Sequence, residues 1–572
     1  MATCIRFRSQ KACSFLLFCL VCVGLMLTIQ QLWLQRVGVR GDICSCTPYP
    51  HQPSNVPPLI AIWQEIQQPN HAPSDRRISH YDVNNSQTLV AVDPKSVAVD
   101  ITSVNRTKYK LISPMTPRVG DTLHFHIEAR NEAGHQIMDG GDFWFGVMES
   151  PKLKAATAAR VIDHHNGTYS MYFLASWAGD VRVRITLVHP SAAIDYLRHS
   201  FRHAEKKVLW NGIFSSRTVK EKSLCWINHH GNMSNTCVYL PQRALHHTQL
   251  ICNLPASLPC NTLSGVVGAT SYAYQFQRVL TPNVAHLFTR AFVNVPLPFE
   301  KPSTIQETID GRAILDPQLY SLPICQADLS RALSDGFWYN NHWQSLVCQP
   351  RIKFSKMNIQ ECLRGQNIYL TGDSTTRQWF AEIAKSLNLS SAADRQFKAK
   401  SFHLFRKDMK SNISLEFIFH PLSLHPSAVF VNFSIVRFEA DVLHSLAKVP
   451  CQNAIVVISP WAHFPNYPWG SYVDWLEGIR DAYSYVKRTC PNIKLVVKTP
   501  HPVNMQWEMK ARDWMFYQMK EAMWKVFQGS GAFFLDVWDM NLSYPSAPIN
   551  MHMPNNVIQE EVSLFLSHAC RR

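Results

Sequence analysis

The sequence lacks the features of a nucleic-acid-binding protein. Its 572 residues contain no dense cluster of Lys and Arg, no zinc-finger spacing and no basic repeat. The formal net charge is nevertheless +15, from 56 Lys and Arg against 41 Asp and Glu. A basic surface of this kind is either simply solvated or attracts acidic glycans or anionic lipid. Nucleic acid is therefore not expected as a partner.

Charged residues are also few. They make up 17% of the chain, whereas hydrophobic residues make up 46%, and this balance excludes wholesale disorder. Aromatic residues contribute 11%, which is enough for sizeable cores. Because ordinary domains run to about 100–200 residues, two or three domains are expected.

A cleavage site is missing after the N-terminal apolar run. Residues 12–29 form an uncharged stretch of 18, close to the about 20 residues that span a bilayer as a helix. No Ala-x-Ala-like site follows, which favours an uncleaved signal anchor over a cleaved signal peptide. Basic residues precede the run and keep that end cytosolic. We expect a cytosolic tail over 1–11, a signal anchor or signal peptide over 12–34, and a lumenal remainder.

The segment from Cys225 to Cys260 lacks the close CxxC pairs of structural zinc sites, so disulfides are predicted there instead of zinc. After residue 22 the chain holds twelve cysteines, an even number, as paired disulfides need. Eight Asn-x-Ser/Thr sequons are present as well. These features predict a glycoprotein of the secretory pathway, either a single-pass protein of the Golgi lumen or a secreted one. The sequons begin at Asn84, Asn105, Asn166, Asn232, Asn388, Asn412, Asn432 and Asn541.

The sequence predicts a stem followed by β-structure in the first half of the chain. Residues 35–80 are rich in Pro, Gln and other polar residues and predict a stem or linker. Period-two alternation follows, as in "DTLHFHIEARN", and predicts an antiparallel β-sandwich of immunoglobulin-like type. The phrase "DHHNGTYSMYFLASWAGDVRVRI" resembles the repeat of filamin-type domains. With its cysteine-rich segment, the whole of 81–300 resembles the neurexophilin-like region of secreted and cell-surface proteins. This resemblance implies that a receptor is a possible binding partner of the region.

The pattern changes after Leu322. Continuous apolar runs alternate with amphipathic stretches such as "WLEGIRDAYSYVKR". Apolar strands separated by helices predict βαβ units and a mostly parallel sheet, so we expect an α/β domain over 301–572. The predicted strands are residues 367–372, 453–459, 493–499 and 531–537.

One of these strands runs into the motif "GDSTTRQW". Ligands of such sheets sit beyond the carboxyl ends of the strands, where Ser374 follows the strand directly. A serine at a strand-to-helix turn can be a nucleophile, with the helix N-terminus stabilising an oxyanion. It can equally be a helix N-cap, a position that serine often takes. The three residues GDS do not decide between these roles, although the rest of the chain favours the nucleophile.

The wider context of GDS is more specific. "FWYNNHWQSLVCQPRIKFSKMNIQECLRGQNIYLTGDSTTRQW" resembles the opening of the PC-esterase domain, and "FLDVWDMNLSYPSAPINMHMPNNVIQEEVSLFLSHAC" resembles its terminal block. Together with the neurexophilin-like region, the chain resembles the NXPE family (neurexophilin and PC-esterase domain). The resemblance implies an SGNH-like fold for the second half of the chain.

The resemblance also implies a set of site residues. His552 would be the general base for Ser374, with Asp539 as the first choice for a third member. Where related PC-esterases have an Asp, this chain has Asn550, and Met553 stands where a Pro is common. No metal is expected. The remaining candidates are Gly372 and His463 for the oxyanion, and Arg377 and Asn550 for binding, although Arg377 and His463 also suit purely structural roles.

Two functions follow from this interpretation. The first is a lumenal serine acyl-transfer enzyme acting on O-acetyl groups of glycans such as sialic acids. A transferase is favoured over an esterase, with no bound cofactor and acetyl-CoA as a possible acyl donor. The second is a non-catalytic secreted or cell-surface ligand that retains a degenerate esterase fold. The expected partners are a glycan or glycoprotein substrate and, through the N-terminal segment, a membrane.

Overall fold

The computed structural model describes most of the chain after residue 100. The predicted cytosolic tail, signal anchor and stem lie outside the described residues, as do Cys44, Cys46 and Asn84. Within the described part, no helix combines the length and apolar character needed to cross a bilayer. The described residues are 101–229, 234–268, 282–298, 303–389, 403–422, 430–503 and 512–570.

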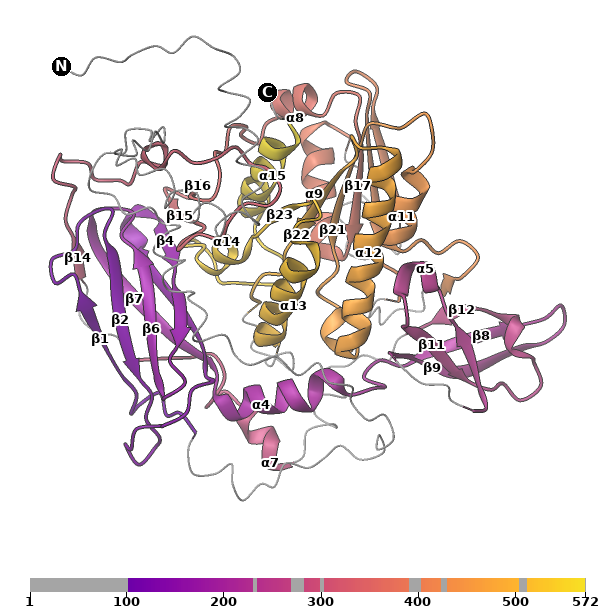
Figure 1. The fold of residues 1–572 in the computed structure, drawn as a ribbon, viewed down its shortest axis with the longest axis horizontal. Coiled ribbons are helices and arrows are strands. Elements are labelled where there is room, and N and C mark those ends of the chain that lie inside the picture. The colour runs from indigo at the N-terminus through magenta and orange to yellow at the C-terminus, as the bar shows by residue number, and fades with distance from the viewer. Residues whose placement is uncertain are drawn as a thin grey trace, which may run out of the picture. The chain divides into compact units, whose positions relative to one another are not determined.

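Two β-sheets pack against each other in the first half of the chain (Figure 1). The four-stranded sheet has the order β1-β2-β6-β5 and the seven-stranded sheet the order β13-β7-β3-β4-β15-β16, with β14 also paired to β7. Leu123 and Ile127 of β2 share one buried cluster with Leu187 of β7, as the period-two alternation of "DTLHFHIEARN" predicts for one face of a strand. The strands are β1 (Lys108–Ser113), β2 (Thr122–Glu128), β3 (Phe143–Ser150), β4 (Ala155–Ala158), β5 (Arg160–Asp163), β6 (Thr168–Leu174), β7 (Gly179–His189), β13 (Val295–Pro296), β14 (Ser303–Ile305), β15 (Gly336–Tyr339) and β16 (His342–Ser345).

The cysteine-rich segment forms a separate six-stranded sheet of order β10-β11-β9-β8-β12-β20. Its last strand comes from beyond residue 400, and β14 to β16 of the larger sheet also come from beyond residue 300. Strand pairing therefore does not divide at the predicted boundary. The strands are β8 (Trp210–Ser215), β9 (Lys220–Asn228), β10 (Thr236–Tyr239), β11 (Gln249–Asn253), β12 (Leu263–Val267) and β20 (Phe430–Asn432).

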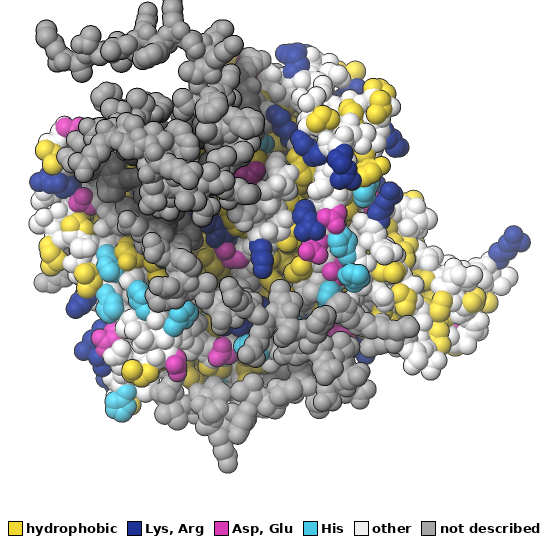
Figure 2. Space-filling model, in the orientation of Figure 1, with side chains coloured by type: hydrophobic (Ala, Val, Ile, Leu, Met, Phe, Trp, Pro, Cys, Tyr) yellow, Lys and Arg dark blue, Asp and Glu magenta, His cyan; other side chains and the backbone are white. Residues whose placement is uncertain are grey.

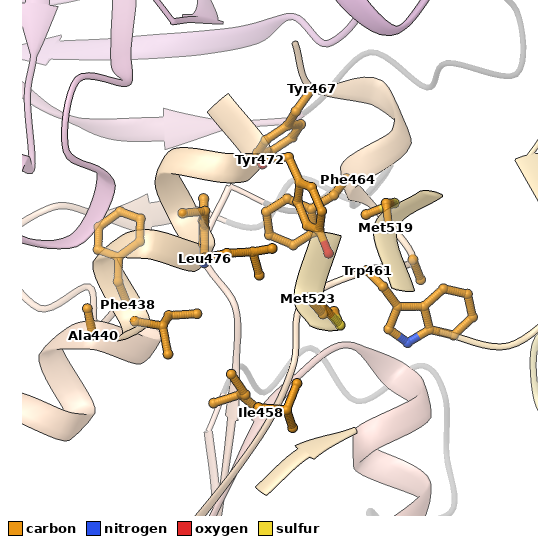
Figure 3. Close-up of a cluster of buried hydrophobic side chains, with 14 of the residues drawn as sticks. Phe438, Ala440, Ile458, Trp461, Phe464, Tyr467, Tyr472, Leu476, Met519 and Met523 are labelled. Atoms are coloured by element: carbon orange, nitrogen blue, oxygen red, sulfur yellow. The ribbon is translucent and has the colours of Figure 1, made fainter. Parts of the chain in front are cut away.

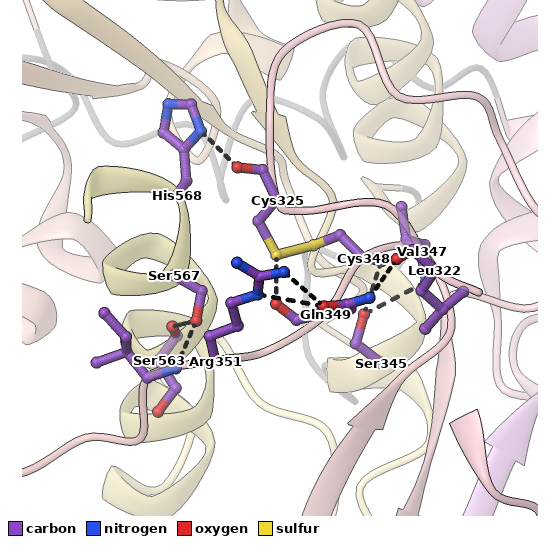
Figure 4. Close-up of a disulfide and its surroundings, with 11 residues drawn as sticks. Leu322, Cys325, Ser345, Val347, Cys348, Gln349, Arg351, Ser563, Ser567 and His568 are labelled. Carbon is purple, nitrogen blue, oxygen red and sulfur yellow. Dashed lines mark hydrogen bonds between the residues drawn. A yellow bond between two sulfur atoms is a disulfide. The ribbon is translucent and has the colours of Figure 1, made fainter. Parts of the chain in front are cut away.

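Disulfides confirm the prediction made for the cysteines. In Figure 4, the Cys325–Cys348 bridge lies beside α15 (Asn555–Ala569), where His568 Nδ1 is 3.1 Å from the Cys325 carbonyl oxygen. Ser567 of the same helix accepts a hydrogen bond from the Ile352 backbone N–H at 3.0 Å. The segment before the GDS motif is thus fixed to the last helix. The bridges are Cys225–Cys252, Cys237–Cys260, Cys325–Cys348, Cys362–Cys570 and Cys451–Cys490.

The sequons differ in accessibility. Asn105, Asn166, Asn388 and Asn412 are exposed and could accept a glycan. Asn541 is fully buried, and its amide nitrogen donates hydrogen bonds to the Val537 carbonyl and to a Glu561 carboxylate oxygen. A glycan cannot be attached to an amide held in this way, so the Asn541 sequon is structural.

The second half of the chain contains a mixed six-stranded sheet of order β18-β19-β17-β21-β22-β23. Only the edge strand β18 is antiparallel to its neighbour. The prediction that residues 453–459 and 493–499 form neighbouring parallel strands is confirmed by the pairing of β21 with β22. The strands are β17 (Asn367–Gly372), β18 (His403–Asp408), β19 (Ile413–Phe419), β21 (Ala454–Ser459), β22 (Lys494–Lys498) and β23 (Phe533–Leu535).

Helices cover both faces of this sheet, which explains why its strands are apolar throughout. Alternate residues of β21 point to opposite sides: Val456 and Ile458 pack with α11, α12 and α13, whereas Ile455 and Val457 pack with α9 and α15. Figure 3 shows part of the cluster on the first side, to which Ile458, Phe464 and Met523 belong. Throughout the described part of the chain, the α-helices are α4 (Ser191–His199), α5 (Gln242–Leu245), α7 (Pro282–Ala285), α8 (Lys356–Cys362), α9 (Ser374–Ser386), α11 (Glu439–Leu446), α12 (Trp469–Thr489), α13 (Arg512–Phe527), α14 (Trp538–Leu542) and α15.

Candidate active site

The turn between β17 and α9 brings Ser374 to the carboxyl edge of the sheet. Gly372 has a φ of +152°, and a Cβ atom there would lie 2.5 Å from Thr376 Oγ1. Both the backbone conformation and the close approach therefore require glycine. The strand ends at Gly372 and the helix begins at Ser374, so the chain reverses over a single intervening residue.

Asp373, and not Ser374, caps the helix. Its Oδ1 accepts hydrogen bonds from the N–H and the hydroxyl of Thr375, both at 2.7 Å, as an N-cap does. Its Oδ2 accepts a hydrogen bond from the Ala462 N–H at 3.0 Å, which ties the loop after β21 to the turn. The alternative role for Ser374 as the helix cap is therefore taken by its neighbour, and the serine hydroxyl is left for another partner.

That partner is His552. The two residues are 178 positions apart, and His552 Nε2 lies 2.8 Å from Ser374 Oγ. When the imidazole is neutral, the hydroxyl donates and Nε2 accepts, which is the arrangement a general base needs. Both side chains are partly exposed to solvent.

The loop that carries His552 is held on both sides of the histidine. The buried ring of His501, which follows β22, lies close to the Met551 backbone. The Met553 carbonyl accepts a hydrogen bond from Gln378 Nε2 of α9 at 2.9 Å. The Met553 side chain is buried in the core beneath α9 and α15. Methionine at this position therefore anchors the loop, although proline is expected there.

Electrostatics favour the neutral form of His552. Burial lowers the pKa of its imidazole below the ordinary 6.5, the negative charge of Asp373 opposes this shift, and the positive charge of Arg377 adds to it. A base must be unprotonated to accept the serine proton, and the lowered pKa keeps it so at neutral pH.

Asp539 does not belong to this pair, and its assignment as the third member is corrected. Its Oδ2 lies 2.6 Å from Arg160 Nη1 and accepts a hydrogen bond from the Asp335 N–H at 3.3 Å. Arg160 comes from β5, 379 positions away, so only the tertiary structure reveals this partner. Arg160 and Asp539 line a cavity of about 220 Å³ between the β-sandwich and α13, together with Lys520.

The structure places the other predicted site residues as follows. The Asn550 side chain is exposed, and in the described part of the chain no hydrogen bond joins it to His552. The Gly372 carbonyl accepts a hydrogen bond from the His420 N–H at 2.9 Å. His463 packs beside His420, with ring centroids 5.2 Å apart, on the loop that holds Asp373. Arg377 lies one turn into α9.

The start of α9 is the helix N-terminus that the sequence leads us to expect beside an oxyanion. The first N–H groups of a helix have no partner within it, and they carry the positive end of the helix dipole. The Ser374 N–H opens α9, directly beside the hydroxyl that would attack a carbonyl. This backbone group can therefore face the oxyanion that forms when Ser374 Oγ attacks.

Sequence reasoning did not identify Asp373, Gln378 and His501 as parts of the site. Asp373 and Gln378 are part of "GDSTTRQW", so their closeness in sequence to Ser374 could have indicated that they belong to the site. His501 follows a predicted strand in "VVKTPHPVN", which places it at the same sheet edge without showing its contact with Met551.

Two protein-family models match the chain. The model for the C-terminal domain of NXPE family member 4-like proteins matches residues 343–570, which contain Ser374 and His552. The neurexophilin model matches residues 129–283, which contain strands β3 to β7 of the β-sandwich and β8 to β12 of the cysteine-rich sheet. Together the two matches cover more than half of the chain.

Proposed function

The chain belongs to the NXPE family, and from this premise we propose that it is a lumenal serine acyl-transfer enzyme acting on O-acetyl groups of glycans such as sialic acids. The observation that carries the proposal is the 2.8 Å contact between Ser374 Oγ and His552 Nε2. A helix N-terminus at the same serine supports it, because acyl transfer needs both an activated nucleophile and an oxyanion site. The fold we assign to this half of the chain is SGNH-like.

The reaction proceeds in two halves. Ser374 Oγ attacks the acyl carbonyl while His552 Nε2 takes the hydroxyl proton, and the oxyanion forms against the Ser374 N–H. The carbonyl re-forms as the bond to the leaving group breaks, and His552 returns the proton to that group. A sugar hydroxyl then gives its proton to His552 as its oxygen attacks the carbonyl of the acyl-serine. The bond between that carbonyl carbon and Ser374 Oγ breaks, and His552 gives the proton to Ser374 Oγ, which restores both residues. Acetyl-CoA is our candidate donor, and the glycan is the acceptor.

Contacts with the backbone of its loop hold His552 in position. The His501 ring beside the Met551 backbone and the hydrogen bond from Gln378 to the Met553 carbonyl hold the loop on either side of the imidazole. A rigidly held base 2.8 Å from the hydroxyl contributes to the rate because the two reacting groups are already oriented for proton transfer. Asp373 adds a negative charge that favours the imidazolium formed during attack.

The compartment fits this function. Disulfides form and persist in oxidising compartments, so the five bridges are consistent with the secretory pathway. We place the protein in the Golgi lumen, anchored by residues 12–34, or outside the cell. Transfer is favoured over hydrolysis because the glycan-modifying proteins that the GDS block resembles are transferases.

A single assay separates the possible activities. Purified full-length protein is incubated with acetyl-CoA carrying a ¹³C-labelled acetyl group and with a desialylated or sialylated glycoprotein, and the released glycans are analysed by mass spectrometry. We expect the label on sialylated glycans only. A parallel reaction with O-acetylated sialoglycoprotein and no donor detects esterase activity as loss of acetyl groups. Neither gain nor loss with either substrate would favour the alternative of a non-catalytic ligand.

A further inference from the structure

A cluster of histidines and carboxylates lies away from the candidate active site, where α12 meets α5. Asp474, Glu477 and Asp481 lie on one face of α12, because residues three, four and seven apart share a helix face. His246 faces them from the end of α5. Figure 2 shows histidine and acidic side chains side by side on this face of the molecule.

We propose that His246, Asp474 and Glu477 bind a Zn²⁺ ion that joins α12 to the cysteine-rich region. One ligand atom from each of the three residues lies within 4.8 Å of the others. Imidazole and carboxylate groups are ordinary zinc ligands at bond lengths of about 2.0–2.2 Å. Small side-chain rotations of the partly exposed His246 and Glu477 can bring these atoms to zinc-binding distances.

The two nitrogens of His246 face different carboxylates. Nδ1 lies 3.9 Å from Glu477 Oε2, and Nε2 lies 3.3 Å from Asp481 Oδ2. With Nδ1 on the metal, the Nε2–H donates to Asp481. A metal-bound histidine usually donates its other ring N–H to a carboxylate in this way, which fixes its tautomer and orientation. Asp481 is therefore a positioning residue for the site.

Neighbouring side chains hold the three carboxylates in place. Arg480 lies 3.6 Å from Glu477 Oε1 and 2.9 Å from Asp481 Oδ1, so it holds the carboxylate oxygens that do not face His246. The buried Asp474 accepts a hydrogen bond from the Thr248 hydroxyl at 2.8 Å. With His246 neutral, three carboxylates and one guanidinium leave two negative charges, which a divalent cation balances.

A second histidine, His229, lies directly after β9 and also contacts Asp474. Its Nδ1 lies 3.0 Å from Asp474 Oδ2. Two glycines of α12 allow these close approaches: a Cβ at Gly470 would lie 2.3 Å from the His229 ring, and one at Gly478 would lie 2.2 Å from the Ala244 carbonyl oxygen. Both histidines lie within the neurexophilin match and the carboxylates within the C-terminal match, so zinc would join the two regions.

Calorimetric titration of the full-length protein tests the site. The protein is first treated with a chelator, dialysed, and then titrated with ZnCl₂ or, for comparison, CaCl₂. We expect one saturable zinc site and no calcium binding, because calcium prefers oxygen ligands. The D481N change should weaken zinc binding by about 10–100-fold, as loss of an outer-shell partner does, and H246A and E477Q should weaken it further.

The neighbouring His247 provides the matched control, because its ring lies 6.5 Å from that of His246 and it is not one of the three proposed ligands. The H247A variant should bind zinc like the parent. Thermal unfolding without metal shows whether each variant is folded, and a given zinc concentration should raise the midpoint of the parent and H247A more than that of D481N, H246A or E477Q. The proposal is overturned if the parent has no saturable zinc site, or if folded H246A and E477Q bind zinc as tightly as the parent.

Discussion

We expect alanine at either Ser374 or His552 to lower the turnover number for the proposed acyl transfer by about 10⁶-fold, and the double variant to be no slower than the slower single variant. The effects should not add, because the 2.8 Å contact would make the hydroxyl and the imidazole act together in one step. Residual activity comes from substrate binding and the backbone oxyanion donor, which both changes leave in place. The measurement is the steady-state rate of labelled acetyl transfer by each purified variant.

The same variants separate a catalytic role from a structural one. Because Asp373 supplies the helix cap, S374A removes no capping hydrogen bond and should leave the thermal midpoint unchanged. The matched control is S386A, at the opposite end of α9, which should keep the parental rate. A folded S374A protein that transfers acetyl groups at the rate of S386A would contradict the nucleophile assignment.

The largest expected loss of stability follows from replacing Glu561. This residue of α15 is fully buried, and one carboxylate oxygen lies 3.6 Å from the equally buried ammonium group of Lys498. The carboxylate also accepts hydrogen bonds from Trp379 Nε1 at 2.6 Å and Asn541 Nδ2 at 2.9 Å. The E561A change leaves a buried charge without its counter-ion and two donors without an acceptor. We expect the free energy of unfolding to fall by about 3–5 kcal/mol.

The preceding residue on the same helix is the control for that change. Glu560 contacts His342 at 3.1 Å, and the histidine side chain is 74% exposed. Exposed ion pairs contribute at most about 1 kcal/mol, so E560A should change stability little. Urea denaturation followed by tryptophan fluorescence compares the two variants. Equal denaturation midpoints for E560A and E561A would show that the buried network does not stabilise the domain.

The parts of the fold that the sequence predicts are those with local signals. Apolar strands separated by amphipathic helices predicted the parallel pairing of β21 and β22, because period and length are read within each segment. The strand–glycine–serine–helix order likewise placed Ser374 at the sheet edge. By contrast, β15 and β16 join the N-terminal sheet across the predicted boundary, and nothing within these short strands identifies their partner.

The site shows the same limit at the level of side chains. Ser374 and His552 were proposed from two motifs that a resemblance linked. Asp539 was proposed because it is the nearest carboxylate of the WDM block, yet its charge is matched by Arg160 from the β-sandwich. A buried carboxylate binds the nearest cation in space, and sequence distance carries no information about that choice. The contact between His501 and Met551 escaped prediction for the same reason.

The central claim is that His552 activates Ser374, and labelling by a fluorophosphonate probe tests it most directly. We expect peptide mapping to find the probe on Ser374, at a rate that increases with pH around a midpoint below 6.5, since the pKa of His552 is lowered and only the neutral imidazole accepts the proton. The R377Q change removes a positive charge that lowers this pKa, so its midpoint should shift to higher pH. The H552A variant should label far more slowly, without this dependence on pH. Absence of labelling at Ser374 in the folded parent, or equal labelling rates in the parent and H552A, would contradict the account.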